Sequence, residues 1–84
     1  MSEERSNQFI KLFCGELREI RKELGYSQED VKKKTGVTKA YLSQVENGKR
    51  EQVSLSLVYQ LSEYYQVPIE DIITRVRNKL KKTD

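Results

Sequence analysis

Apolar residues recur at helical spacing along most of this chain. Between residues 7 and 24 they follow one another at intervals of three or four, which places them on one stripe of a helix. The members of this stripe are Phe9, Phe13, Leu17, Ile20 and Leu24. Gly25 follows directly, and a glycine in this place commonly ends a helix. The pattern therefore predicts a first helix over about residues 7–24.

The middle of the chain carries two shorter helical patterns, each preceded by a capping residue. Ser27 can accept a hydrogen bond from the backbone N–H three residues later, and Asp30 can reach back to complete a capping box. Gly36 ends this second helix, and Thr38 caps a third. Two short helices joined at a glycine turn predict a helix-turn-helix over about residues 27–47.

The last third of the chain predicts two further helices. One covers residues 54–65, and the other covers residues 68–81 and starts with a proline, which suits a first helical turn. We expect residues 1–6 and 82–84 to be flexible tails, which leaves a single domain over residues 7–81. Because no strand-like alternation persists, the expected fold is all-α, with five helices.

Composition narrows the functions that this fold can have. The chain has 84 residues, one cysteine, no histidine and a formal charge of +3, a balance that admits nucleic acid as a partner without requiring it. It lacks a metal-ligand cluster and a glycine-rich phosphate loop, so we expect no enzyme, no metal and no cofactor. Without a secretory signal or a membrane-spanning run, we expect a cytoplasmic protein in which Cys14 packs as a free thiol.

The third helix has an unusual polar face. A helical wheel turns one set of side chains inward and leaves short, uncharged, hydrogen-bonding side chains outside. The inward set is Leu42, Val45 and Glu46, and the outward set is Ala40, Ser43, Gln44 and Asn47. A face that served solubility alone would more often carry Lys and Glu, whereas DNA base edges call for groups such as these. The pattern favours base reading over an ordinary solvated face.

The segment "GELREIRKELGYSQEDV", followed by "GVTKAYLSQVENGKR", resembles the lambda-repressor-like, Xre/Cro-type helix-turn-helix proteins. The similarity runs from about Phe9 to Ile73, and its pieces fall in order as LRxIR, GxSQE, GV, YLSxVENGKR and VPIEDI. This resemblance implies a compact five-helix bundle whose second and third helices form the helix-turn-helix. It also implies a sequence-specific DNA-binding regulator, often dimeric, with double-stranded DNA as its partner.

The resemblance also assigns roles to residues of this chain. The positions that face base edges are Lys39, Ala40, Ser43 and Gln44. The positions that contact phosphates are Gln28, Tyr41, Asn47, Lys49 and Arg50. For Tyr41, packing and phosphate contact are equally compatible with its place on the flank of the helix. Glu46 faces inward on the wheel, and the family pairs this position with an arginine of the first helix, here Arg21, so we expect a structural ion pair.

The apolar stripe of the last helix has two interpretations. It can pack internally against the first helix, or it can meet a second copy of the chain across a two-fold axis. We favour a mixed role, with a dimer interface built from Tyr65, Ile69, Ile72, Ile73, Val76 and Leu80.

The resulting hypothesis is a homodimeric regulator of the repressor type that binds a palindromic operator, with the third helix in the major groove. The alternative is an antitoxin or adaptor that uses the C-terminal apolar helix to hold a protein partner.

Overall fold

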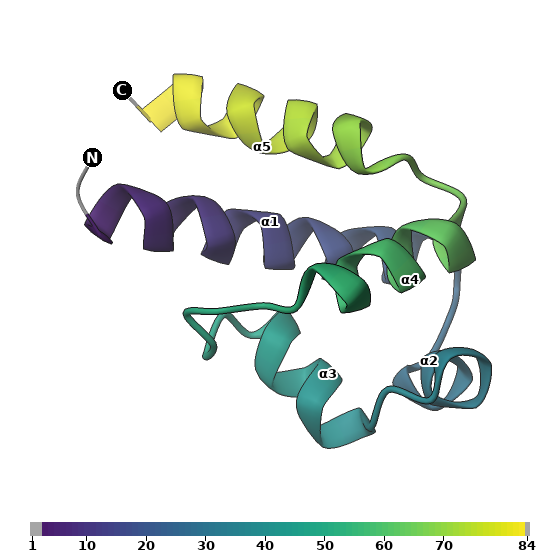
Figure 1. Cartoon of the computed structure of the whole chain (residues 1–84). Coiled ribbons are helices and arrows are strands. Elements are labelled where there is room, and N and C mark those ends of the chain that lie inside the picture. The colour runs from purple at the N-terminus through teal and green to yellow at the C-terminus, as the bar shows by residue number, and fades with distance from the viewer. Residues whose placement is uncertain (1–2, 84) are drawn as a thin grey trace.

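A computed structural model describes residues 3–83, which form five helices and no strand (Figure 1). The helices are α1 (Glu3–Glu23), α2 (Gln28–Thr35), α3 (Lys39–Glu46), α4 (Leu55–Tyr65) and α5 (Ile69–Thr83). The expected all-α fold with a helix-turn-helix in its second and third helices is confirmed.

The long helix α1 organises the bundle. It contacts α3, α4 and α5, while α2 contacts α3 and α4. Helices α1 and α5 run side by side in opposite directions, and α2 and α3 lie on the other side of α1 (Figure 1). Helix α3 therefore stands at the far edge of the domain from α5, with its outer face clear of the bundle.

Every helix contributes to one apolar core. The largest fully buried apolar side chains are Leu17, Ile20, Val31, Leu42, Val45, Leu61, Ile72 and Val76. Burial of one such side chain stabilises the folded state by about 1.5–3 kcal/mol before conformational entropy is subtracted. The two short helices α2 and α3 are thus held mainly by packing, because eight isolated residues would not stay helical in water.

Both end helices are longer than predicted. Helix α1 begins at Glu3, so residues 3–6, which we expected in a flexible tail, are helical, and α5 continues through Thr83. The charges explain the extension, since Glu3 and Glu4 occupy the first turn of α1 and Lys81 and Lys82 the last turn of α5. Acidic groups favour the positive end of a helix dipole and basic groups the negative end. The remainder of both predicted tails, residues 1–2 and 84, lies outside the described residues.

The predicted dimer stripe is partly wrong. Tyr65, Ile72 and Val76 are 3 %, 0 % and 0 % exposed, so they belong to the core and cannot meet a partner in this fold. Ile72 and Val76 are buried because α5 packs along α1, which uses the apolar side of α5 within one chain. Tyr65 lies at the end of α4, where its ring contacts those of Tyr26 and Tyr64. The other three members, Ile69, Ile73 and Leu80, are only partly buried.

Ion pairs reinforce the contact between α1 and α5. The carboxylate of Glu16 is buried, and it pairs with Lys79 and with Arg75 Nη1, the latter at 3.6 Å. Arg75 Nη1 also lies 3.6 Å from the carboxylate of Glu23, which is two turns further along the same side of α1. Two cations from α5 thus compensate the burial of one carboxylate from α1, which fixes the register of the two helices.

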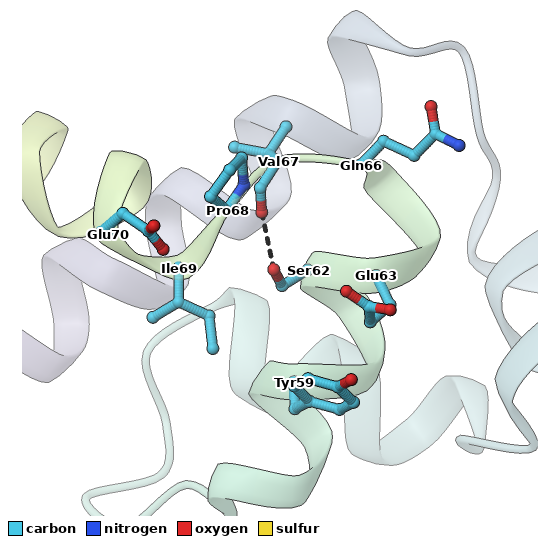
Figure 2. Close-up of a pocket in the computed structure, with 8 residues that line it drawn as sticks. All are labelled: Tyr59, Ser62, Glu63, Gln66, Val67, Pro68, Ile69 and Glu70. Carbon is cyan, nitrogen blue, oxygen red and sulfur yellow. Dashed lines mark hydrogen bonds between the residues drawn. The ribbon is translucent and has the colours of Figure 1, made fainter.

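A compact corner joins α4 to α5 (Figure 2). Gln66 takes the left-handed conformation at φ 58°, and the Ser62 hydroxyl donates a hydrogen bond of 2.7 Å to the carbonyl of Val67. The backbone N–H of Val67 returns to the carbonyl of Ser62, which completes the helix end. Pro68 then starts the turn into α5. Ser62 and Val67 also line a shallow pocket at this corner.

Two glycines with different backbone conformations allow a test of the fold. A Cβ added to Gly15, inside α1, meets nothing within 4 Å, whereas Gly36 closes α2 at φ +81°. We expect Gly15→Ala to raise the free energy of unfolding by about 0.5–1 kcal/mol because alanine is the better helix former. Gly36→Ala should lower it by about 1–2 kcal/mol because an L side chain is strained there. Urea unfolding measures both, and changes of the same sign would contradict the assigned backbone.

Candidate nucleic-acid interface

Helix α3 is fixed at its start and along its inner side. The Thr38 hydroxyl accepts a hydrogen bond from the backbone N–H of Tyr41, and Leu42 and Val45 are fully buried. Its outer side carries the side chains that we predicted to read bases. Of these, Lys39, Ala40 and Gln44 are exposed and Ser43 is partly exposed. The structure therefore places all four on one accessible face.

The end of α3 reverses the chain. Gly48 adopts φ +69°, its N–H bonds to the carbonyl of Val45, and the N–H of Lys49 bonds to the carbonyl of Gln44. This pair of bonds defines the Schellman motif, which needs a left-handed residue and favours glycine. Lys11 of α1 packs so closely that a Cβ on Gly48 would lie 2.8 Å from its Cγ. The motif brings Lys49 and Arg50 back beside the outer face of α3.

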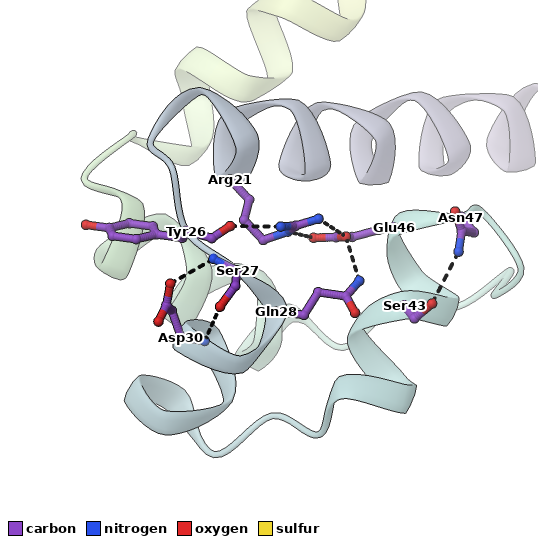
Figure 3. Close-up of polar contacts among 8 residues, drawn as sticks. All are labelled: Arg21, Tyr26, Ser27, Gln28, Asp30, Ser43, Glu46 and Asn47. Atoms are coloured by element: carbon purple, nitrogen blue, oxygen red, sulfur yellow. Dashed lines mark hydrogen bonds and ion pairs between the residues drawn. The ribbon is translucent and has the colours of Figure 1, made fainter.

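A buried polar network lies behind this face (Figure 3). Arg21 Nε and Nη2 donate to the two carboxylate oxygens of Glu46, at 2.7 and 3.0 Å. Arg21 Nη1 donates to the backbone carbonyl of Tyr26 at 2.8 Å, and Gln28 Nε2 donates to Glu46 at 3.2 Å. The expected ion pair between Arg21 and Glu46 is therefore present, and it joins the end of α1, the start of α2 and the end of α3.

The network keeps its charges in spite of burial. The side chains of Arg21 and Glu46 are 10 % and 1 % exposed, and the hydrogen bonds to Glu46 raise the pKa of Arg21 above its ordinary value. The two-pronged arginine fork satisfies both carboxylate oxygens, which offsets much of the desolvation cost. Gln28, a predicted phosphate ligand, is part of this network. Its amide nitrogen carries two N–H groups, so one remains to point at a phosphate.

The exposed side chains around α3 also pair with one another. Asn47 Nδ2 donates to the Ser43 hydroxyl at 3.3 Å, and Lys39 Nζ lies 3.7 Å from the carboxylate of Glu29 on α2. Both contacts are open to solvent, where such pairs are worth only about 0–1 kcal/mol. Such weak contacts order the side chains and leave them able to exchange partners. The sequence alone does not indicate the pairing of Lys39 with Glu29, because the two residues lie on different helices.

Arg50 makes two contacts with α3. Its Nη1 donates to Gln44 Oε1 at 3.2 Å, and its guanidinium carbon lies 4.9 Å from the centroid of the Tyr41 ring. The Tyr41 ring is partly buried and packs against the core, so the packing role considered for this residue is present. Its phosphate contact stays a prediction. The sequence alone also does not indicate the hydrogen bond between Arg50 and Gln44, because this bond depends on the chain reversal at Gly48.

A shallow polar hollow adjoins this end of α3. It is lined by Gln44, Lys49, Arg50, Glu51 and Gln52. The basic pair stands beside Gln44, while the carboxylate of Glu51 at the rim reduces the local positive potential. The surface is thus only moderately basic, with uncharged donors and acceptors at its centre.

Groups for other chemistry are scarce in the described residues. Residues 3–83 contain no cluster of three or more His, Cys, Asp and Glu that could hold a metal ion. No helix among them is both long and apolar enough to cross a membrane. Burial raises the pKa of the Cys14 thiol to about 11, so it stays protonated near neutral pH and is a poor nucleophile.

Comparisons with known proteins identify a family for this chain. The model of a family described as Helix-turn-helix matches residues 17–72, more than half of the chain. The chain is also 32 % identical, over 72 residues, to the glutamine–fructose-6-phosphate aminotransferase [isomerizing] of Methanocaldococcus jannaschii. That similarity covers 86 % of this chain, but the chain spans 7 % of the length of the aminotransferase. The likeness therefore concerns one short segment of a much larger enzyme.

The buried ion pair yields a stability prediction. Glu46→Leu or Arg21→Met leaves an uncompensated buried charge, and each should lower the free energy of unfolding by about 3–5 kcal/mol. The double variant removes both charges and should lose much less than the sum of the two. Glu29→Ala, which breaks the exposed pair with Lys39, is the matched control and should cost less than about 1 kcal/mol. Chemical denaturation measures all four, and additive losses would contradict the network.

Proposed function

The chain belongs to the lambda-repressor-like, Xre-type helix-turn-helix family of DNA-binding regulators, and from this premise we propose that it binds a specific operator through α3. The observation that carries the proposal is the orientation of Glu46. This residue is the single carboxylate of α3, and it is turned inward onto Arg21. The outer face of α3 therefore carries no carboxylate of its own, which suits the approach of DNA phosphates.

The outer face suits the edges of base pairs. Helix α3 has eight residues and a length of roughly 12 Å, which fits within the major groove. Gln44 can bind adenine through two hydrogen bonds, Lys39 can donate to guanine, and the Ala40 methyl can contact the methyl of thymine. Ser43 can donate or accept. These four residues are the proposed base readers.

Residues around both ends of α3 suit the DNA backbone. Gln28 stands at the N-terminus of α2, where helix amides also attract anions. Asn47, Lys49 and Arg50 follow α3 on its exposed side, with the Tyr41 hydroxyl nearby. Contacts of this kind set register and salt dependence. We assign these five residues to phosphate binding.

We further propose a homodimer on a palindromic site. The described surface retains a small apolar hollow of about 220 Å³, whose lining includes Phe9, Ile10, Ile69 and Ile73. Leu55 also lines this hollow and is 74 % exposed, so each copy offers both a projecting side chain and a recess. A two-fold axis pairs such features reciprocally. The two α3 helices would then enter successive major grooves about 34 Å apart.

Two exposed apolar residues of α4 favour a second function. Leu55 and Tyr59 on α4 could hold a foreign protein, as in an antitoxin or adaptor. Recovery of a second protein in a stoichiometric complex, together with a monomeric state of the purified chain, would favour this alternative over the homodimer.

Selection of bound sequences from random DNA tests the proposed function. We expect one palindromic consensus, and recovery of unenriched DNA would contradict the proposal. Lys49→Ala should weaken binding to all sequences alike and flatten the slope of log affinity against log salt by about 0.9 per lost phosphate contact. Lys81→Ala removes the same charge from the far end of α5 and is the control, with little expected change in slope.

The proposed dimer is tested by sedimentation. Leu55→Glu places a charge in the apolar interface and should shift the protein from dimer to monomer. Leu24→Glu changes another exposed leucine, 44 % exposed at the end of α1, and should leave the dimer intact. Both positions are exposed, so neither change should unfold the chain. A monomeric unmodified protein at high concentration would overturn the dimer.

A further inference from the structure

One side chain outside α3 holds a proposed base reader in place. The guanidinium of Arg50 bonds to Gln44 Oε1 at 3.2 Å and lies 4.9 Å from the centroid of the Tyr41 ring. Tyr41 and Gln44 are three positions apart, so they stand one above the other on the same side of α3. The Schellman motif at Gly48 directs Arg50 back across both of them.

The chemistry of arginine fixes which way the Gln44 amide points. A guanidinium has five N–H donors and no acceptor, so the carbonyl oxygen of Gln44 must face Arg50. The amide NH₂ then faces the opposite way. Without this partner, the amide can turn over by 180° at little cost in water, which exchanges its donor and its acceptor.

The orientation of the amide decides which base pair it matches. Each base pair presents donors and acceptors in its own order along the major groove. An amide with a fixed order matches one arrangement, whereas an amide that turns over matches more than one. We infer that Arg50 determines the base preference of Gln44 by holding its amide in one orientation. Arg50 is thus a specificity-determining positioning residue, and this inference rests on the proposed DNA-binding function.

Tyr41 restricts the movement of the Arg50 side chain. Its ring is partly buried and packs against the core, so it offers a fixed platform for the guanidinium. Attraction between the cation and the ring face limits the positions that Arg50 can take. Gln44 is then ordered before DNA arrives, which lowers the entropy lost on binding. The remaining N–H groups of Arg50 can still bind a phosphate.

The neighbouring Lys49 is a matched comparison. Lys49 and Arg50 are adjacent, exposed and equally charged, and both line the hollow beside Gln44. If both residues bound phosphate alone, their alanine variants would behave alike. The proposed positioning role predicts that only the Arg50 variant alters base preference.

The experiment compares sequences selected from random DNA by the unmodified protein, Gln44→Ala, Arg50→Ala, Lys49→Ala and the double variant Q44A/R50A. Loss of preference in Gln44→Ala identifies the base pair that Gln44 reads. At this base pair we expect Arg50→Ala to reduce discrimination by roughly tenfold, with the other positions unchanged. Lys49→Ala should retain the full preference. At this base pair the double variant should show the same discrimination between bases as Gln44→Ala, with no further loss, because Arg50 acts through Gln44.

The outcomes separate this inference from the function beneath it. If the unmodified protein selects no sequence, the proposed function fails, and the inference fails with it. The unmodified protein can select a consensus while Arg50→Ala and Lys49→Ala show equal base preference at the pair that Gln44 reads. In that case the inference alone is overturned. In the free protein, the Tyr41 ring should shift the NMR signals of the Arg50 side chain upfield, and signals at their random-coil positions would also overturn it.

Discussion

The buried ion pair between Arg21 and Glu46 sets the orientation of the proposed reading helix. Its carboxylate comes from the last residue of α3, and its guanidinium comes from the last turn of α1. The guanidinium also donates to the carbonyl of Tyr26. Gln28 adds a bond from the first residue of α2. Three helix ends thus converge on one charge pair. Because a rotation of α3 would leave a charge in the core without its partner, the pair selects the rotation that leaves the side of α3 without a carboxylate outside.

The remaining definition of α3 comes from its two ends and its neighbours. An eight-residue helix has few internal hydrogen bonds, so the Thr38 cap and the Gly48 turn account for a large share of them. The turn has a second effect, since it returns the chain to the outer face and places Arg50 against Gln44. The Schellman motif that ends α3 therefore also orders the surface that we propose reads DNA.

Helix α5 shows how a small domain uses one apolar stripe. A chain of 84 residues buries a modest fraction of its surface, so the core needs the inner side of α5 for its own stability. Ile72 and Val76 are used in this way, and pairs from Lys79 and Arg75 to Glu16 hold the register. Ile69 and Ile73 stay at the margin of the core, where they line the apolar hollow beside Leu55 that we proposed as a dimer contact.

The sequence by itself determined the elements that depend on near neighbours. Caps at Ser27 and Thr38, the glycine stops and the helical periodicity act over three or four residues, so they can be found without a structure. The resemblance to a family supplied the partner of Glu46. The tertiary structure decided what covers the apolar side of α5 and where Arg50 lies, because both depend on packing between residues far apart in the chain or across a reversed turn. A periodic stripe identifies the apolar side of a helix, but only the assembled bundle shows what covers it.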